Sequence, residues 1–475
     1  MNFKKNEFQN YLLKFENIEI IYKSPKQHWG ITNKGLKKRI SISVFNEFLK
    51  IKKLISYEDS KKIKKGINFK ILQNKIEIFL KEKKISINVI SNFSNLSLLL
   101  NNQLDKNVKK EYGIFFTSSF LVKLILDQLK LILIRLNIKI KNVLEPSCGS
   151  GQFLFGLNEY FSGLNICGLE LNKFIYNNIK QISFCNNNLI IKKKNFLNFF
   201  NDNFDLIIGN PPFRIIKKSL VINYNDFFSN KVNLYALFLL HSLKLLKKNG
   251  VLVMVLPKSF LNSISYNSIR YYISINFKIL LILDNFDNNF FLGTCVETFV
   301  LFLQKKKCNS KDFFVFFGKY LSFSNHFKYL NQILMEGKSL KDLGFNITVG
   351  TILKSKKKLY NSGTKGFFIC DNNIEDNKIK LDFTSIIHSN FLYTESCIVV
   401  FRGYGNTKLN FKYALIDIKE GFLVENHLLI IRQVGNISLI ELIKKFKKKK
   451  TLDFIDLYFN NQSLTKIDLE LLPIF

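Results

Sequence analysis

The residues most suited to chemistry lie in the run Phe204-Asp-Leu-Ile-Ile-Gly-Asn-Pro-Pro-Phe213, where an apolar stretch ends in an amide, two prolines and an aromatic ring. The side-chain oxygen of Asn210 can accept a hydrogen bond, and the ring constraints at Pro211 and Pro212 hold the Pro211 carbonyl rigidly. Two fixed acceptors suit an –NH2 group, because accepting both hydrogens makes its nitrogen lone pair nucleophilic. Phe213 could stack on the planar ring that carries the amine. Alone, the run could also be only a rigid turn after a strand.

A second candidate site is the run Val143-Leu-Glu-Pro-Ser-Cys-Gly-Ser-Gly-Gln-Phe-Leu154, which is typical of a strand, a turn of small residues and the start of a helix. Gly149 and Gly151 let the backbone turn tightly and approach a ligand. The helix that begins near Gln152 offers free N–H groups, and Glu145 at the strand tip suits a cationic ligand group. A nucleotide cofactor at the carboxyl edge of a parallel sheet fits this run, although its spacing matches neither a dinucleotide fingerprint nor a Walker loop.

A further acidic residue follows in the run Cys167-Gly-Leu-Glu170. An acid at a strand end about twenty residues after a glycine turn can bind both hydroxyls of a ribose. Such an acid is otherwise often only solvated. Together with the glycine turn, Glu170 favours a cofactor that carries a ribose.

The elements that must position these residues alternate between short β-branched runs and amphipathic helical stretches over residues 110–305. This alternation predicts an α/β fold with a mostly parallel sheet. The predicted strands are Asn142–Glu145, Asn165–Glu170, Leu189–Lys192, Asp205–Gly209, Val251–Leu256, Leu280–Asp284 and Glu297–Leu303.

Together the two runs resemble the amino-methyltransferases that use S-adenosylmethionine. More narrowly, they resemble the N6-adenine DNA methyltransferases of restriction–modification systems in which a target-recognition domain follows the catalytic motif. The segment Glu145-Pro-Ser-Cys-Gly-Ser-Gly-Gln-Phe153 resembles that family's Asp-Pro-Ala-Cys-Gly-Ser-Gly-x-Phe signature. The segment Gly113-Ile-Phe-Phe-Thr-Ser118 resembles the start of its cofactor site, with Ser118 in place of the usual proline.

The resemblance implies roles for individual residues. Thr117 and the Gly149–Gly151 turn would hold the methionine end of S-adenosylmethionine, and Glu170 would hold its ribose. Asn195-Phe196 stands where the family usually has Asp-Phe, whose acid meets the adenine amine of the cofactor; an amide can still accept there. The cofactor-binding residues so implied are Phe116, Thr117, Glu145, Ser147, Gly149, Gly151, Glu170, Asn195 and Phe196, the catalytic residues are Asn210, Pro211, Pro212 and Phe213, and no metal is expected.

The resemblance also implies an architecture. We expect a seven-stranded, mostly parallel, Rossmann-like methyltransferase sheet with helices on both faces over residues 106–305. A Lys-rich, mostly helical extension of unknown role would precede it (1–105). A connection (306–335) and a mixed α+β target-recognition domain (336–475) would follow. Looser matches support this order at Asn233–Phe238, Leu245–Phe260, Asp342–Thr351 and Ser463–Ile474.

The charge of the chain favours a polyanionic partner. The 475 residues include 71 Lys and Arg against 36 Asp and Glu, a formal net charge of +35, and such an excess suits nucleic acid. A skew toward Lys, Asn, Ile and Phe also indicates an AT-rich genome, which inflates Lys whatever the function. The run Lys444–Lys450 is accordingly either a solvated face or a phosphate-contacting patch.

Other segments bear on the setting of the protein. No stretch of about 18 uncharged apolar residues predicts a membrane span, the N-terminus lacks the apolar core of a signal peptide, and the seven cysteines form no Cys-x-x-Cys pair. We therefore expect a cytoplasmic protein. The resemblance implies an enzyme that acts on double-stranded DNA, with a cognate restriction endonuclease as a candidate partner.

Four alternatives remain open from the sequence. A glutamine N5-methyltransferase acting on a protein carries a similar Asn-Pro-Pro-aromatic motif, and a charge of +35 does not separate RNA from DNA as substrate. Asp59 with Glu82-Lys-Lys84 could form a fused nuclease centre, although a Lys-rich chain produces that pattern by chance. A DNA-binding subunit without activity is the fourth, and the intact Asn210–Phe213 run argues against it.

Overall fold

The computed structural model describes residues 19–23, 28–33, 36–41, 94–217, 222–228, 232–284, 291, 296–353, 355, 362–403, 409–459 and 463–475. The chain divides into two compact units, one of residues 1–214 with 286–295 and the other of residues 215–285 with 296–475. This division differs from the boundaries expected from the sequence at 106, 306 and 336, which stay predictions. The candidate nuclease residues Asp59 and Glu82–Lys84 lie outside the described residues.

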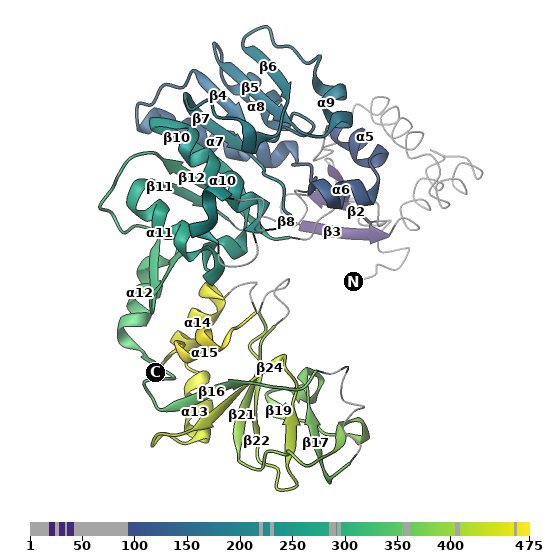
Figure 1. Cartoon of the computed structure of the whole chain (residues 1–475), viewed down its shortest axis with the longest axis vertical. Coiled ribbons are helices and arrows are strands. Elements are labelled where there is room, and N and C mark those ends of the chain that lie inside the picture. The colour runs from purple at the N-terminus through teal and green to yellow at the C-terminus, as the bar shows by residue number, and fades with distance from the viewer. Residues whose placement is uncertain are drawn as a thin grey trace, which may run out of the picture. The chain divides into compact units, whose positions relative to one another are not determined.

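A seven-stranded sheet is formed by strands between residues 142 and 304, with the strand order β11-β12-β10-β7-β4-β5-β6 (Figure 1). Its strands are β4 (Asn142–Glu145), β5 (Asn165–Glu170), β6 (Asn188–Lys193), β7 (Phe204–Gly209), β10 (Leu246–Pro257), β11 (Lys278–Leu283) and β12 (Thr298–Gln304). Strand β4 pairs in parallel with β5 and β7, and β5 pairs in parallel with β6. Strand β12 runs antiparallel to β10 and β11. The predicted mostly parallel α/β fold is therefore confirmed.

The order of the strands reverses at the carboxyl ends of β4 and β7. The chain runs outward from β4 through β5 to β6, then returns to β7 on the other side of β4. In open α/β sheets such a reversal is where ligands bind. Glu145 ends β4, Gly209 ends β7, and Glu145 lies opposite Gly168 of β5 in the parallel register. The two candidate runs therefore meet at one edge of the sheet.

Helices cover this sheet through apolar faces. The helices of the described part are α5 (Asn95–Gln103), α6 (Lys106–Tyr112), α7 (Ser119–Arg135), α8 (Gln152–Tyr160), α9 (Lys173–Ile179), α10 (Leu234–Leu245), α11 (Asn267–Asn276), α12 (Phe327–Glu336), α13 (Leu439–Phe446), α14 (Lys449–Tyr458) and α15 (Lys466–Glu470). Helix α9 packs on β5 and β6, α10 packs on β10, and α11 packs on β11. None of these helices is both long enough and apolar enough to span a bilayer.

The described residues of the N-terminal segment form helix α5 and, where the sequence favoured helices, three strands. Strands β1 (Glu19–Lys23), β2 (His28–Asn33) and β3 (Leu36–Ser41) make an antiparallel three-stranded sheet. Strands β1–β3 differ from the expectation of a mostly helical extension, which stays a prediction for the segment as a whole. The run Leu36-Lys-Lys-Arg-Ile-Ser41 has three consecutive basic residues and no period of two, so this strand could not be predicted from local pattern.

The described part of the C-terminal region contains two larger sheets and the two-stranded pairs β13-β14, β15-β25 and β18-β19. Its larger sheet has the order β16-β24-β21-β22 and its smaller sheet the order β20-β17-β23, while β13 pairs with β14. The remaining strands are β8 (Ile215–Ile216), β9 (Val232–Asn233), β13 (Phe314–Phe317), β14 (Tyr320–Phe323), β15 (Lys338–Ser339), β16 (Phe345–Val349), β17 (Thr364–Ile369), β18 (Ile374–Glu375), β19 (Lys378–Ile379), β20 (Ile386–Ser389), β21 (Cys397–Phe401), β22 (Tyr413–Ile416), β23 (Phe422–Val424), β24 (Leu428–Gln433) and β25 (Pro473–Ile474). The mixed α+β character expected for residues 336–475 is confirmed.

Gly156 controls the packing of α8 on α7, and its replacement tests that packing. A Cβ at this position would lie 2.6 Å from Leu126 and 2.8 Å from Val122, both buried. Ala gains about 0.5–1 kcal/mol of helix propensity over Gly, but overpacking a core costs about 1–3 kcal/mol. We expect Gly156→Ala to lower the free energy of unfolding, by about 1–2 kcal/mol net.

Denaturant unfolding followed by circular dichroism measures this change. Asn177→Ala, on the exposed face of α9, is the matched control and should leave stability nearly unchanged. A Gly156→Ala variant as stable as the wild type would show that α7 yields to the added methyl group.

Candidate active site

The side chain of Asn210 is held in one orientation at the carboxyl end of β7. Its amide nitrogen donates to the Thr117 hydroxyl at 3.1 Å, and the Ser147 hydroxyl donates to its backbone carbonyl, also at 3.1 Å. The amide oxygen is buried and has no hydrogen-bond partner. A buried acceptor without a partner carries a desolvation cost of about 1–3 kcal/mol. The site is therefore built around an acceptor that a ligand donor can satisfy.

The chain N-terminal to Thr117 packs directly against the proline loop. Gly113 ends α6 in the left-handed conformation with φ +67°. A Cβ there would lie 3.2 Å from the Phe213 nitrogen and 3.2 Å from Pro212. The rings of Phe115 and Phe213 lie 6.1 Å apart, tilted by 39°. Gly113 thus serves both the helix end and the close approach to the loop.

The turn after β4 is closed by Glu170. Gly149 and Gly151 adopt φ +52° and +80°, a region that L side chains rarely occupy. The Gly149 N–H donates to one carboxylate oxygen of Glu170 at 3.0 Å, and the Asn172 N–H donates to the other at 2.7 Å. Each oxygen retains acceptor capacity for a ligand hydroxyl. The ring of Phe116 borders the turn, 4.0 Å from where a Gly149 side chain would begin.

Glu145 and Glu170 are two buried acids at the same sheet edge. Burial, and secondly the charge of Glu170, raises the pKa of Glu145 well above its usual range, although a backbone hydrogen bond from Leu154 opposes the shift. Burial also raises the pKa of Glu170. One carboxylate oxygen of Glu145 is buried without a hydrogen-bond partner. A cationic ligand group here would satisfy that oxygen and favour the charged form of Glu145, so the residues present fit the cationic S-adenosylmethionine.

Helix α5, in the N-terminal segment, contacts the cofactor turn. The hydroxyls of Ser97 and Ser150 share a hydrogen bond of 2.7 Å, and the Gln152 amide donates to the Ser94 hydroxyl at 2.6 Å. The sequence analysis missed this contribution. Ser94 caps α5 by accepting from the Ser97 N–H, and a Ser before an apolar run was the local signal available.

Two of the expected cofactor residues make local contacts in the described part of the chain. The Asn195 side chain caps a short 3-10 helix by accepting from the Leu197 N–H at 3.1 Å. Phe196 is 2% exposed and belongs to the core. The other expected residues, from Phe116 to Phe213, gather at the edge formed by β4, β5 and β7. The roles of all of them remain predictions.

Comparisons with known proteins support a methylase. Residues 36–291, more than half of the 475, match the family model of the Eco57I restriction-modification methylases. The type II methyltransferase M.CvrRI of Paramecium bursaria Chlorella virus XZ-6E is 27% identical over 402 residues, which cover 81% of this chain and 99% of that protein. The modification methylase CviBIII of Paramecium bursaria Chlorella virus NC1A is 33% identical over 130 residues, which cover 27% of this chain and 34% of that protein.

Among solved structures, the type IIG restriction endonuclease BpuSI aligns with 79% of this chain and 60% of its own, at 11% identity and a TM-score of 0.40. The family match begins at residue 36 and so includes much of the segment that the sequence analysis set apart as an extension. Helix α5 belongs to that matched part.

Because Glu145 is buried, we predict that its carboxylate lowers the stability of the fold as the pH rises and strengthens the binding of S-adenosylmethionine. Because the pKa of Glu145 is raised in the folded protein, the folded state binds its proton more tightly than the unfolded chain. Stability is then lost as the pH rises from the unfolded value, about 4.3, through the folded one. We expect Glu145→Gln to raise Tm at pH 8, by about 2–4 °C for each kcal/mol relieved, and to weaken S-adenosylmethionine binding.

Thermal unfolding at pH 5, 6.5 and 8, with calorimetric titration of S-adenosylmethionine, measures both effects. The gain in Tm should shrink toward pH 5. Glu159→Gln, on the exposed side of α8, is the control and should change neither quantity. A gain in Tm that is equal at all three pH values would contradict the assignment to Glu145.

Proposed function

Because the chain belongs to the Eco57I restriction-modification methylase family, we propose that it is a site-specific DNA methyltransferase that modifies the N6 amine of adenine in double-stranded DNA. S-adenosylmethionine is its methyl donor. The separate restriction endonuclease of the system would be its partner in function.

One observation carries the choice of an amine as acceptor of the methyl group. The Asn210 amide nitrogen donates to Thr117, so the amide oxygen, which is buried and has no hydrogen-bond partner among the described residues, is left as an acceptor. An –NH2 group donates two hydrogen bonds. The Asn210 oxygen would accept one and the Pro211 carbonyl the other.

The target adenine would be turned out of the duplex, since a base amine inside the stack cannot reach a protein cleft. Phe213 would stack on the exposed base, and the two acceptors would draw the amine nitrogen toward tetrahedral geometry. When bound, S-adenosylmethionine supplies an electrophilic methyl group on a sulfonium. Thr117 and the Gly149–Gly151 turn would hold its methionine end, Glu170 would hold its ribose, and Glu145 would face its cationic group. Catalysis would depend mainly on positioning and on fixed hydrogen-bond acceptors.

The choice of double-stranded DNA rests on family membership and on charge. A formal net charge of +35 favours phosphate contacts, and residues 336–475 offer a separate region for target recognition. RNA and a protein glutamine remain the alternatives, because each also presents an –NH2 group on a planar carbon.

The direct test is transfer of labelled methyl from S-adenosylmethionine to unmethylated double-stranded DNA, RNA and protein in parallel. Label recovered from DNA as N6-methyladenine is the expected result. Label recovered only from RNA or protein would be consistent with methylation of an amine but would refute double-stranded DNA as the substrate. Label recovered from DNA as methylcytosine would refute the choice of base.

Replacing Asn210 tests the central acceptor. Asn210→Ala removes the oxygen that would meet the target amine, and we expect methyl transfer to become undetectable. Binding of S-adenosylmethionine, measured by calorimetry, should change by less than about threefold, since the turn after β4 is intact. Normal turnover by Asn210→Ala would refute the proposed mechanism.

Replacing Thr117 tests the orientation of the Asn210 amide. Thr117→Val keeps the shape of the side chain but removes the acceptor for the amide nitrogen. We expect kcat to fall about 10- to 100-fold, as the loss of one buried hydrogen-bond partner allows. Thr117→Ser keeps the hydroxyl and should retain most of the activity. Equal rates for Thr117→Val and Thr117→Ser would show that this hydrogen bond does not matter.

A further inference from the structure

The segment expected to be a simple connection is an ordered part of the second unit. It forms β13, β14 and α12, and we refer to residues 314–336 as the docking segment. Phe317 of β13 lies at the centre of an aromatic cluster, with ring centroids 5.4 Å from Phe454, 4.9 Å from Tyr458 and 5.9 Å from Phe459. Phe317 and these three partners are all buried. Helix α14 of the C-terminal region therefore packs on the docking segment through a shared core.

Arg270 joins the docking segment to the residues that follow β10. It is fully buried on α11, donates from Nε to the Leu321 carbonyl of β14, and donates from Nη1 to the Phe260 carbonyl at 2.8 Å. The Leu321 N–H in turn donates to the side chain of Asn267 at 2.9 Å. Burial lowers the pKa of Arg270 to about 10. Among the described residues the partners of Arg270 are backbone carbonyls, and burying an arginine charge is costly. Arg270 links two backbone segments far apart in sequence.

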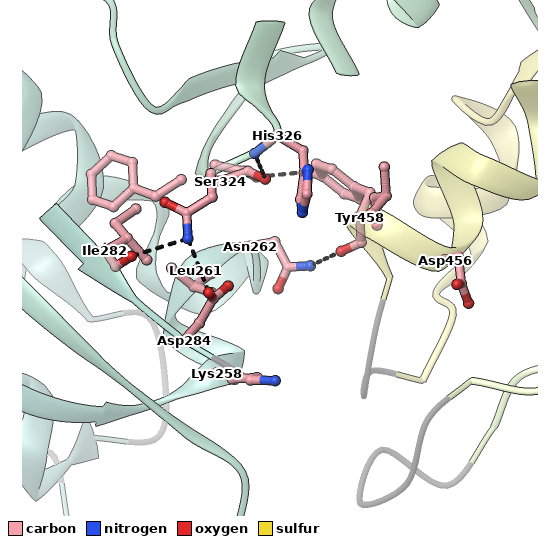
Figure 2. A pocket seen from close by; sticks show the side chains of 13 residues that line it. Lys258, Leu261, Asn262, Ile282, Asp284, Ser324, His326, Asp456 and Tyr458 are labelled. Atoms are coloured by element: carbon pink, nitrogen blue, oxygen red, sulfur yellow. Dashed lines mark hydrogen bonds between the residues drawn. The ribbon is translucent and has the colours of Figure 1, made fainter. Parts of the chain in front are cut away.

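Tyr458 of α14 contacts both β14 of the docking segment and the residues that follow β10. Its hydroxyl shares a hydrogen bond of 2.6 Å with the Ser322 hydroxyl of β14, and its backbone carbonyl accepts from the Asn262 amide. Figure 2 shows the Asn262 contact at the edge of a polar pocket of about 240 Å³. Asn262 comes directly after the short helix Lys258–Leu261, which continues from β10. The end of α14 is thus attached to the edge of the central sheet.

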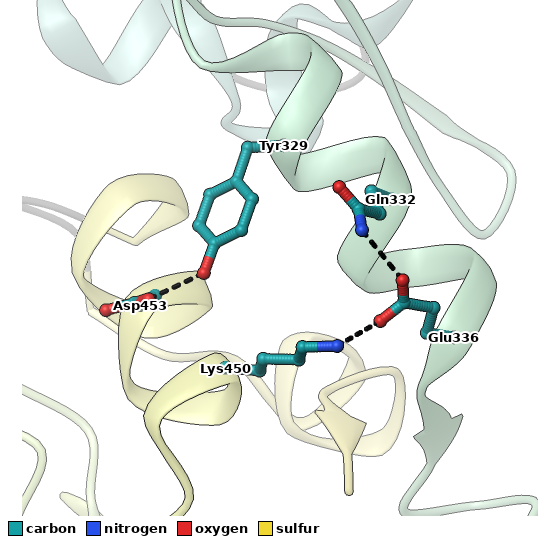
Figure 3. Close-up of polar contacts among 5 residues, drawn as sticks. All are labelled: Tyr329, Gln332, Glu336, Lys450 and Asp453. Carbon is teal, nitrogen blue, oxygen red and sulfur yellow. Dashed lines mark hydrogen bonds and ion pairs between the residues drawn. The ribbon is translucent and has the colours of Figure 1, made fainter.

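A second set of contacts holds the start of α14 against α12. The Tyr329 hydroxyl donates to Asp453 at 2.6 Å, and Lys450 forms an ion pair with Glu336, which also accepts from Gln332 at 2.8 Å (Figure 3). Tyr329, Gln332 and Glu336 are spaced by three and four residues, so they lie on one face of α12. Lys450 belongs to the charge run Lys444–Lys450, and for this lysine the described contact is an ion pair within the protein.

We propose that the docking segment fixes helix α14, and with it the target-recognition region, on the part of the chain that follows β10, and that Ser322, Glu336 and Lys450 are positioning residues for methyl transfer. The inference rests on the proposed function. Residues 336–475, the docking segment and β10 belong to one compact unit, and an ångström-scale misplacement of a bound base can cost up to about 100-fold in rate. A flexible connection would not prevent such misplacement.

A charge exchange between α12 and α14 tests the proposal. Glu336→Lys and Lys450→Glu each place like charges together, and the double variant restores an ion pair with the same net charge as the wild type. We expect each single variant to lower the single-turnover rate of methyl transfer by about three- to tenfold, within the range for misplacement, and the double variant to recover to within about twofold. Binding of S-adenosylmethionine should not change in any variant.

The matched control is the exposed pair Glu375–Lys380, which lies in the C-terminal region outside the docking segment. Glu375→Lys, Lys380→Glu and their double variant should show no loss followed by recovery. Single variants of Glu336 and Lys450 with wild-type rates would overturn the proposal. A double variant that stays as slow as Lys450→Glu would also overturn it, since Lys450 would then act through the nucleic acid.

A buried pair gives an independent arm that does not depend on surface charge. Ser322→Ala removes the hydrogen-bond partner of the Tyr458 hydroxyl, and we expect this variant to transfer methyl more slowly than the wild type. Ser322→Ala with Tyr458→Phe removes both partners, and we expect its rate to return toward that of the wild type. A Ser322→Ala variant that is faster than the double variant would overturn the role of Ser322. Rates are measured on the acceptor that the wild-type protein labels, starting with unmethylated plasmid DNA. Absence of label from DNA refutes the proposed function, and the comparison among variants still decides the role of the docking segment.

Discussion

The hydrogen bond from the Asn210 amide nitrogen to the Thr117 hydroxyl sets the orientation of the Asn210 amide in the candidate site. An amide that is free to rotate presents either a donor or an acceptor, and only the acceptor suits an amine. Thr117 selects the acceptor, and Ser147 holds the Asn210 carbonyl from the other side. Neither partner would reach Asn210 if β7 and β4 did not end at the same sheet edge. The tight contact of Gly113 with the proline loop serves the same alignment, because it fixes the segment that carries Thr117.

The two buried acids beside this site, Glu145 and Glu170, destabilise the protein when no ligand is bound. Two buried carboxylates raise each other's energy, and one oxygen of Glu145 has no partner at all. Replacement of such groups usually stabilises a protein at the expense of activity. The arrangement is understandable where the ligand brings a positive charge, since the ligand then supplies the missing partner. The same reasoning applies to the unpartnered oxygen of Asn210, which a hydrogen-bond donor on the ligand would satisfy. Both orphaned oxygens lie near the reversal of strand order, where the fold leaves room for a ligand.

The sequence predicted those parts of the fold that depend on local pattern. Strands β4 and β5 begin and end at the predicted residues, because each is a short apolar run between turn signals. Contacts over long separations could not be predicted in this way. The bond between Asn210 and Thr117 spans 93 residues, and the one between Ser97 and Ser150 spans 53. The sequence around a threonine or a serine does not indicate a hydrogen-bond partner so distant along the chain. The roles assigned to Asn195 and Phe196 came from resemblance, and local contacts neither test nor replace them.

The docking segment shows how composition hides structure in this chain. Phe and Lys are frequent throughout this chain, so a run rich in both does not distinguish a packed segment from a linker. The sequence therefore predicts only a connection at this segment. In the fold, Phe317 anchors the aromatic cluster under α14, while the lysine at position 450 is paired across to Glu336. A chain with an excess of 35 positive charges can attract a polyanion from any direction. Long-range attraction does not orient the bound duplex, however. Orientation needs rigid attachment of the recognition region, and the contacts of Arg270, Ser322 and Tyr458 attach helix α14 to the residues that follow β10 within one compact unit.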